Sequence, residues 1–208
     1  MNNNMVCQGK KVKMRFNVFF ILFLLVVFSC IDSNEETGLI EVTKRYYKGL
    51  DKSDTSGIEP ILSDTIVTRE NEYNYEQEFS KKEYIEWMKW DSVFQPTYKI
   101  IGFEQENDIV KVQISKTDKR ISFLHKEPII TNQIVRFDRD KISHIETVEY
   151  VVYNDSLWVE NRGHFLEWVN NNYPEMNGVI YDQTKTGGIK YLELIQLYEN
   201  SNKSYKEQ

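Results

Sequence analysis

The sequence predicts an α+β protein in which helices come first, an antiparallel sheet follows, and further helices end the chain. Between residues 36 and 93, apolar residues recur every three or four positions, as on one face of a helix. From Thr97 to Tyr153, runs rich in β-branched and aromatic residues alternate with short turns. Helical spacing returns after residue 154. Segregated helices and strands of this kind indicate N-terminal helices packed on a sheet.

The first helix is expected to run from Asp32 or Asn34 to Lys48. Gly49 would end it, because glycine is favoured just past the end of a helix. The apolar stripe of this helix consists of Leu39, Val42, Tyr46 and Leu50. A short second helix is expected near Asp54, and it carries Ile58, Ile61 and Leu62.

A strand and a third helix complete the N-terminal part. The segment DTIVTRENEY, residues 64–73, is expected to be a strand that leads into a loop. Ser80 caps the third helix, and Glu83 three residues later completes a capping box. This helix presents Tyr84, Trp87, Met88 and Trp90 to the core.

Five β-rich runs follow the third helix. They are TYKIIGF, DIVKVQIS, RISFLH, IITNQIVRF and KISHIETVEYVVY. Short turns such as EQEND and DRD join them, so we expect an antiparallel meander.

The length of the DRD turn decides which side chains share a face of the sheet. A three-residue turn pairs Phe137 with Lys141, and then one face holds Gln133, Ile145, Thr147 and Glu149. A two-residue turn groups Gln133 with His144 and Glu146 instead. The first alternative is favoured because it places more apolar side chains beside Val135.

The order of elements resembles the nuclear transport factor 2-like superfamily, which includes ketosteroid isomerases and polyketide-cyclase-like proteins. The resemblance covers about residues 36–153, and RFDRDKISHI is similar to the family's penultimate hairpin. Asp140 stands where the family usually has glycine, and aspartate tolerates a left-handed backbone. The resemblance implies a cone-shaped fold in which helices pack on a curved sheet and enclose a pocket.

Residues 154–200 are expected to form a helical extension packed on this domain, and residues 201–208 a disordered tail. Ser156 would cap the first helix of the extension, and Gly188 would open the second. Left unpacked, five apolar side chains would form a large exposed patch: Trp158, Phe165, Trp168, Leu192 and Ile195. The sequence KTGG is not a phosphate-binding loop, because the GK[ST] ending is missing.

Residues 1–29 have the features of a signal peptide. Basic residues precede an apolar run, Phe16–Phe28, of thirteen residues. A membrane-spanning helix needs about 20. Cys30 comes next, and VFSC resembles the lipobox of bacterial lipoproteins. The resemblance implies that the chain is cleaved before Cys30 and that Cys30 carries fatty acids such as palmitate. Cys7 is the only other cysteine and lies in the leader. Met1 and Met14 are alternative starts.

The acidic segment after Cys30 has two interpretations. Residues 30–35 form a linker, with Ser33 and Glu36 at capping-box spacing for a following helix. Alternatively, IDSNEE resembles the surface-export signal of Bacteroidetes lipoproteins. The expected location is the cell envelope, at the outer membrane, with exposure at the surface under the second interpretation.

Charge excludes nucleic acid as a partner. All 32 acidic residues but only 22 of the 26 basic ones follow Cys30, so the mature chain has a net charge near −10. Binding to nucleic acid needs a basic surface. The expected partners are the membrane, through the lipid on Cys30, and a small apolar ligand or another envelope protein.

No cofactor or metal is expected. The three histidines, His125, His144 and His164, lack the spacing of a metal site and are expected at the surface. No G-x-S-x-G motif of a serine hydrolase is present.

The isomerases of the superfamily use a carboxylate base on the first strand and acidic or phenolic donors deeper in the cone, as the resemblance implies. Arg69 stands near the base position, with Glu70 on the opposite face. Gln133 is expected near the position of the family's acidic donor, and Tyr46 or Tyr47 could supply the phenolic donor. The candidate pocket residues are Tyr46, Trp87, Gln133 and Glu149, although core packing is the simpler explanation of Tyr46 and Trp87. No catalytic residue is assigned.

Two classes of function follow from this reasoning. The first is a non-catalytic, lipid-anchored module that binds a small ligand or a partner protein. The second is an enzyme of the isomerase, dehydratase or cyclase kind. An intact acid–base pair inside the cone would favour the enzyme, and a closed or filled cone the binding module. A scaffold whose extension mediates assembly is a third alternative.

Overall fold

The computed structural model describes residues 33–206, with side chains from Gly38 to Ser201. The predicted signal peptide and Cys30 lie outside the described residues. Within residues 33–206, none of the helices combines the length and apolar character that a membrane span needs.

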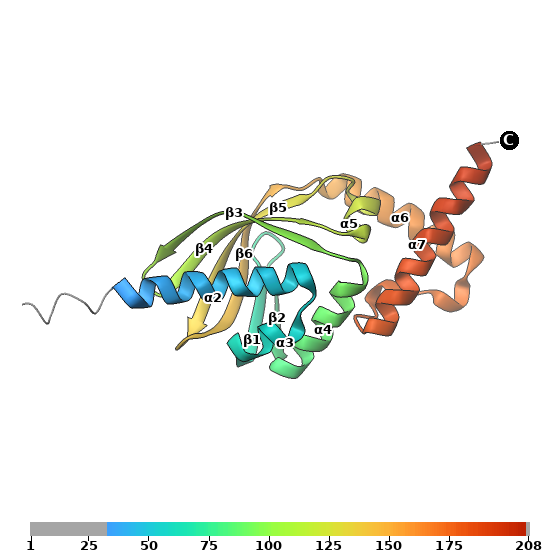
Figure 1. Cartoon of the computed structure of the whole chain (residues 1–208). Coiled ribbons are helices and arrows are strands. Elements are labelled where there is room, and N and C mark those ends of the chain that lie inside the picture. Colours follow the sequence, from blue (N-terminus) through green and yellow to red (C-terminus); the bar gives the residue numbers. More distant parts are fainter. Residues whose placement is uncertain (1–32, 207–208) are drawn as a thin grey trace, which may run out of the picture. The chain divides into compact units, whose positions relative to one another are not determined.

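A curved six-stranded sheet forms the centre of the unit that begins at Gly38 (Figure 1). Its strands are β1 (Leu62–Glu70), β2 (Tyr75–Ser80), β3 (Thr97–Glu106), β4 (Ile109–Thr117), β5 (Ile129–Asp138) and β6 (Lys141–Val152). The spatial order is β2-β1-β6-β5-β4-β3. Neighbouring strands are antiparallel except β1 and β6, which run parallel.

Three helices and a 3₁₀ turn cover one face of the sheet: α2 (Ser33–Lys52), α3 (Thr55–Ile58), η1 (Glu59–Ile61) and α4 (Lys81–Val93). Their apolar side chains meet those of the sheet in a first core cluster, which includes Leu50, Ile58, Met88, Val112, Val135 and Ile145. Ser80 and Glu83 form the predicted capping box of α4. The predicted α+β class is therefore confirmed.

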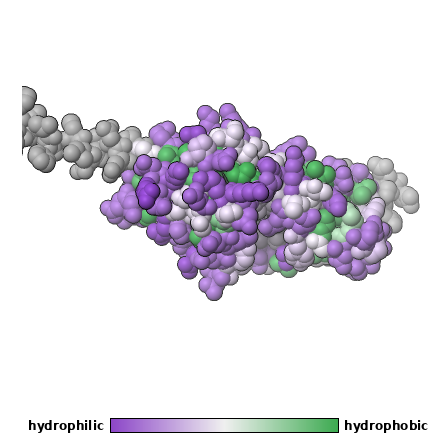
Figure 2. Space-filling model, turned by 90° about the horizontal axis from the view of Figure 1, so that it is seen from below, coloured by the Kyte–Doolittle hydropathy of each residue, from purple (hydrophilic) through white to green (hydrophobic). Residues whose placement is uncertain are grey.

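The C-terminal part adds α5 (Lys119–Leu124), α6 (Asp155–Asn172), the 3₁₀ turns η2 (Pro174–Met176) and η3 (Val179–Tyr181), and α7 (Lys185–Lys206). These helices form a second core cluster with Trp90 and Phe94 at the end of α4. Phe165 and Ile195 are buried there, and Trp168 and Leu192 pack against them. On the face shown in Figure 2, the hydrophobic areas are small and separate, as expected if the extension buries its apolar side chains.

Helix α2 runs through Gly49, so the prediction that this glycine ends the helix is wrong. A Cβ on Gly49 would lie only 2.3 Å from Cγ1 of Ile58. Gly49 is thus needed for the close approach of α3 to α2. The chain turns instead at Ser53, which has a positive φ of 53°.

Two elements differ from their predicted type. The segment predicted as a loop after β1 contains β2, in which Gln77 and Phe79 point inward and Glu76 and Glu78 outward. The run RISFLH forms helix α5 rather than a strand, because the Asp118 side chain caps it by accepting a hydrogen bond from the Ile121 N–H at 2.6 Å.

The helices of the extension begin and end elsewhere than predicted. Asn154, not Ser156, caps α6, because its side chain accepts a hydrogen bond from Leu157 N–H. Helix α7 begins at Lys185, three residues before Gly188, and continues to Lys206 through most of the predicted tail. At the other end of the domain, α2 begins at Ser33, between the two predicted starts Asp32 and Asn34, so its first residues belong to the predicted acidic linker.

Candidate functional site

A cavity of about 440 Å³ lies between the sheet, α2 and α4, and the extension closes part of it. Eight tyrosines line it: Tyr46, Tyr47, Tyr73, Tyr75, Tyr84, Tyr98, Tyr150 and Tyr153. Trp87, Trp90 and Trp158 add indole rings. Cavities of this size and aromatic character are typical of small-ligand sites.

One end of the cavity is formed by Tyr46 and Tyr47 of α2, Tyr84 of α4 and Gln133 of β5, and we call it the phenol end. The Tyr46 and Tyr84 hydroxyls are hydrogen-bonded to each other. Tyr47 donates to Gln133 Oε1 at 2.5 Å, and Gln133 Nε2 donates to Thr147 Oγ1 at 3.2 Å. Each of these polar groups therefore has a partner.

The phenols at this end are neutral. Burial raises the pKa of Tyr46, Tyr47 and Tyr84 above the ordinary tyrosine value. Burial disfavours the phenolate because the charged form loses its hydration. The hydroxyls can therefore act as hydrogen-bond donors at neutral pH, but not as bases.

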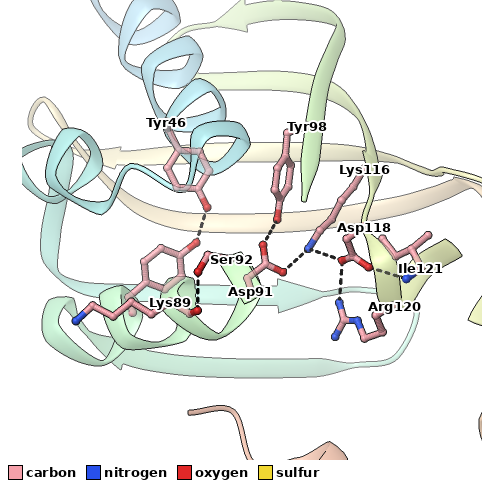
Figure 3. Close-up of polar contacts among 10 residues, drawn as sticks. Tyr46, Lys89, Asp91, Ser92, Tyr98, Lys116, Asp118, Arg120 and Ile121 are labelled. Carbon is pink, nitrogen blue, oxygen red and sulfur yellow. Dashed lines mark hydrogen bonds and ion pairs between the residues drawn. The ribbon is translucent and has the colours of Figure 1, made fainter. Parts of the chain in front are cut away.

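A buried charged cluster lies beside the cavity and joins α4 to β3, β4 and α5 (Figure 3). Asp91 pairs with Lys116 at 2.7 Å and accepts a hydrogen bond from the Tyr98 hydroxyl at 3.0 Å. Asp118 lies 3.8 Å from Lys116 and 3.6 Å from Arg120. Burial raises the pKa of Asp91, but the charges of Lys116 and Arg120 outweigh this and lower it.

The other end of the cavity includes Arg120, with the Trp90 and Trp158 rings 4.9 Å and 5.9 Å from its guanidinium carbon, and we call it the arginine end. Arg120 belongs to α5, the helix that the sequence predicts as a strand. Trp158 and Gln183 come from the extension. The extension thus contributes side chains to the cavity as well as stability.

At the rim, Glu70 is the one carboxylate that lines the cavity within the described part of the chain. The Tyr150 hydroxyl donates to it at 2.9 Å. Burial, and then the negative charge of Glu70, raise the pKa of Tyr150. Arg69 also lies at the rim, where it pairs with Glu76 at 3.8 Å.

Three of the four candidate pocket residues line the cavity, and Glu149 does not. The DRD turn has two residues, with Asp138 opposite Lys141, so the favoured three-residue turn is wrong. Register shifts nevertheless place Gln133 opposite Thr147.

A further shift at Val148 moves Glu149 to the outer face. Gln133 pairs with Thr147 and Asn132 with Glu149, so Val148 has no partner and the alternation reverses. Glu149 is exposed and accepts a hydrogen bond from Asn132. Tyr150 takes the inward position instead.

Two smaller predictions are also corrected. His125 is buried rather than at the surface, and its Nε2 accepts a hydrogen bond from Asn154 N–H at 2.7 Å. The left-handed residue of the DRD turn is Arg139, with φ of 57°, and not Asp140. His144 and His164 are exposed. Among the described residues there is no group of side chains that could hold a metal ion.

No protein-family model matches the sequence, and no curated protein is similar to it. Its fold is similar to solved structures of nuclear transport factor 2-like proteins. One, a protein of unknown function from Burkholderia xenovorans, is 12% identical with a TM-score of 0.46, over 60% of this chain and 92% of its own. Another, from Cytophaga hutchinsonii, is 9% identical with a TM-score of 0.42, over 52% and 86%.

A third similar structure is an epoxide hydrolase/cyclase-like enzyme of pyran ring formation in salinomycin. It is 14% identical with a TM-score of 0.43, over 54% of this chain and 90% of its own. Enzymes and proteins of unknown function thus occur among the similar structures. At these values the similarity concerns the arrangement of helices and strands and not the chemistry of the site.

Proposed function

We propose that this chain is a lipid-anchored envelope protein whose cavity binds a small, flat, largely apolar ligand without converting it. The observation that carries the proposal is the cavity of about 440 Å³, which is lined by aromatic rings. Aromatic side chains offer large apolar surface and polar edges, and both suit a flat ligand.

The hydrogen bonds of the site favour binding over turnover. A general base must reach the proton that it removes, and its geometry matters before its pKa does. Glu70 is the only carboxylate that lines the cavity in the described residues, and the Tyr150 hydroxyl already binds it. The phenols of the phenol end bind one another or Gln133.

The test is a ligand screen by thermal shift and tryptophan fluorescence, since Trp87, Trp90 and Trp158 line the cavity. Gln133→Leu should weaken binding of the ligands that the screen finds, because it breaks the hydrogen bonds to Tyr47 and Thr147 that hold this wall of the cavity in shape. Gln113→Leu is the matched control on the neighbouring strand, where Gln113 binds Asn132 away from the cavity. Equal affinities of the two variants, or no ligand at all, would contradict the proposal.

The rim pair of Glu70 and Tyr150 favours the second candidate, an enzyme of the isomerase, dehydratase or cyclase kind. A carboxylate and a phenol at a cavity edge could move a proton if Tyr150 released Glu70 on substrate binding. The test is exchange of α-protons of a bound ketone with deuterium, followed by NMR. Exchange by the wild type that Glu70→Gln abolishes would make the enzyme the better description.

We also propose that Cys30 carries the lipid anchor. The support is the basic and apolar leader that precedes it and the lipobox-like VFSC. Cys30→Ala should lose incorporation of an alkyne-labelled fatty acid and leave the membrane fraction. Cys7→Ala is the matched control, because it changes the only other cysteine and should behave like the parent. Membrane-bound, labelled Cys30→Ala protein would contradict the anchor.

Surface exposure is a separate proposal that depends on the acidic residues after Cys30. Replacing Glu35 and Glu36 with alanine should reduce cleavage of the protein by protease added to intact cells. Unchanged cleavage would show that these residues are only the start of α2, which begins at Ser33.

A further inference from the structure

The Arg120 side chain at the arginine end has no hydrogen bond to any described residue. It lines the cavity, and its Nε is buried without a partner. Its guanidinium carbon lies 4.9 Å from the centre of the Trp90 ring, 5.4 Å from Phe94 and 5.9 Å from Trp158. These cation–π contacts hold the guanidinium among the rings, but they supply no hydrogen-bond acceptor to its N–H groups.

A second donor without a partner lies at the same end. Trp90 Nε1 is buried and has no hydrogen-bond partner among the described residues. Buried donors nearly always have partners in folded proteins, because leaving one unpaired costs free energy. Asp118 Oδ2, 3.6 Å from Arg120, is likewise buried without a hydrogen-bond partner among the described residues. Trp90 and Arg120 both line the cavity, so their unpaired donors favour a ligand that carries an acceptor group.

The other cation of this region is already engaged. Lys116 binds Asp91 at 2.7 Å and lies 3.8 Å from Asp118. Arg120 approaches only Asp118, at 3.6 Å. Burial opposes the charge of Arg120, but Asp118 and Asp91 raise its pKa, so the guanidinium stays charged. It is a positive group with donors to spare.

We infer that the arginine end is an anion subsite and that the ligand of the cavity is a small aromatic monocarboxylate. The inference rests on the proposed binding function and names its ligand class. A planar carboxylate matches the fork of a guanidinium, and Trp90 Nε1 can donate to the same group. The apolar body of the ligand then lies among the aromatic rings toward the phenol end.

The charges of the cluster select a carboxylate over a phosphate. Lys116 and Arg120 balance Asp91 and Asp118, so the four groups together are neutral. A ligand with one negative charge can pair with Arg120. A second negative charge on the ligand finds no further cation and is repelled by the two buried carboxylates. Anions with two charges should therefore bind more weakly than monocarboxylates of the same size.

The experiment compares 2-naphthoate with 2-naphthamide, which have nearly the same shape and differ in charge. Affinities come from quenching of tryptophan fluorescence and from calorimetry. The wild type should bind the acid about tenfold more tightly than the amide, as expected for a charge-assisted hydrogen bond. Arg120→Gln removes both the charge and the fork, so it should lose most of this preference. Arg136→Gln is the control and should keep it, because Arg136 does not line the cavity and pairs with Glu146 at 3.0 Å.

The outcomes separate this inference from the proposed function. If the amide binds and the acid binds no more tightly, the anion subsite is wrong and the binding function stands. If neither compound binds, the inferred ligand class is wrong, and the ligand screen decides the binding function separately. If Arg120→Gln does not fold, Trp90→Phe decides, because it keeps an aromatic ring at this position and removes the indole N–H. An unchanged preference for the acid in that variant would overturn the subsite.

Discussion

The two ends of the cavity contain similar kinds of side chain but differ in how their polar groups are paired. At the phenol end, Tyr46 binds Tyr84 and Tyr47 binds Gln133, so each phenol has a partner within the protein. At the arginine end, Arg120 Nε and Trp90 Nε1 have none among the described residues. Aromatic rings surround the polar groups at both ends.

This difference separates a structural polar network from a binding group. A buried network with every donor and acceptor paired stabilises one arrangement of the core. Donors left over in a cavity lining favour a ligand that completes them. The ends also differ in origin, because the phenol end comes from the sheet, α2 and α4, and the arginine end needs the extension.

The largest expected loss of stability comes from removing the extension, residues 155–208. A chain that ends at Asn154 loses six buried apolar side chains: Phe165, Val169, Val179, Tyr191, Leu194 and Ile195. Each is worth about 1.5–3 kcal/mol, and a whole domain is stable by only about 5–15 kcal/mol. The truncated chain should therefore unfold or aggregate at 25 °C, as measured by circular dichroism and size-exclusion chromatography.

A chain that ends at Asn200 is the control, because it keeps all six of these side chains. It should melt within a few degrees of the full chain. Equal melting temperatures for all three chains would show that the phenol end and the sheet stand without the extension, and that the two ends are independent.

The next largest effect concerns the charged cluster beside the arginine end. Asp91→Asn removes the carboxylate that pairs with Lys116, and Asp91 is only 2% exposed. Breaking a buried ion pair from one side costs about 3–5 kcal/mol. Glu106→Gln breaks the exposed pair with Lys111 and is the control, at about 1 kcal/mol or less. Urea unfolding measures both free energies.

The effect of Asp91 should depend on pH in a defined direction. The pKa of Asp91 is lower in the folded protein than its ordinary value, because Lys116 and Arg120 outweigh burial. The stability that Asp91 contributes is thus complete above its unfolded pKa of about 3.9 and is lost as pH falls through the folded pKa. The gap between wild type and Asp91→Asn should be constant near neutrality and narrow in acid. A gap that widens in acid would contradict this assignment.

The sequence predicts most of the fold, because local patterns determine most of its elements. The capping box of Ser80 and Glu83 marks α4, and the stripe that includes Tyr46 marks α2. Helix α5 is missed because RISFL has the composition of a strand, and the cap from Asp118 decides otherwise. Asp118 is a favourable N-cap residue, so the sequence does contain a signal for helix α5.

The site is predicted less well than the fold, and the reason is register. Tyr46, Trp87 and Gln133 lie on regular stretches, so their inward positions follow from periodicity. The unpaired Val148 reverses the alternation of β6, which puts Tyr150 inward and Glu149 outward. No residue type near Val148 in the sequence indicates this register shift. Arg120 is missed because its helix is missed.

A smaller effect is expected at the phenol end, where a double-mutant cycle can measure the pairing. Tyr46→Phe and Tyr84→Phe each leave one buried hydroxyl without its partner, which costs about 1–3 kcal/mol. The double variant should lose less stability than the two single variants added together, because it leaves no hydroxyl without a partner. Neither change should alter the preference for acid over amide, which we assign to the other end.

The exposed Tyr75 supplies the control for this cycle. Its hydroxyl donates to Gln77 at 2.8 Å, and the residue is 50% exposed. Tyr75→Phe should change stability by no more than about 0.5 kcal/mol, as is usual at the surface. Strictly additive costs for Tyr46 and Tyr84 would mean that their hydroxyls do not depend on each other, and that the phenol end is not a closed network.

The smallest effects on stability compare the helices that build the two ends, because α6 contains one interior glycine, Gly163, and α2 contains Gly38 and Gly49. Alanine is a better helix former than glycine by about 1 kcal/mol. Gly163→Ala in α6 should stabilise the protein by nearly that amount, because its Cβ would meet nothing within 4 Å. Gly49→Ala in α2 should destabilise it by about 1 kcal/mol, since the Cβ would lie 2.3 Å from Ile58 and overpacking costs about 1–3 kcal/mol. Opposite shifts of the urea midpoint would show that the packing behind the phenol end is tight and that α6 tolerates added bulk there. Stabilisation by both changes would mean that α3 moves away from α2 at little cost.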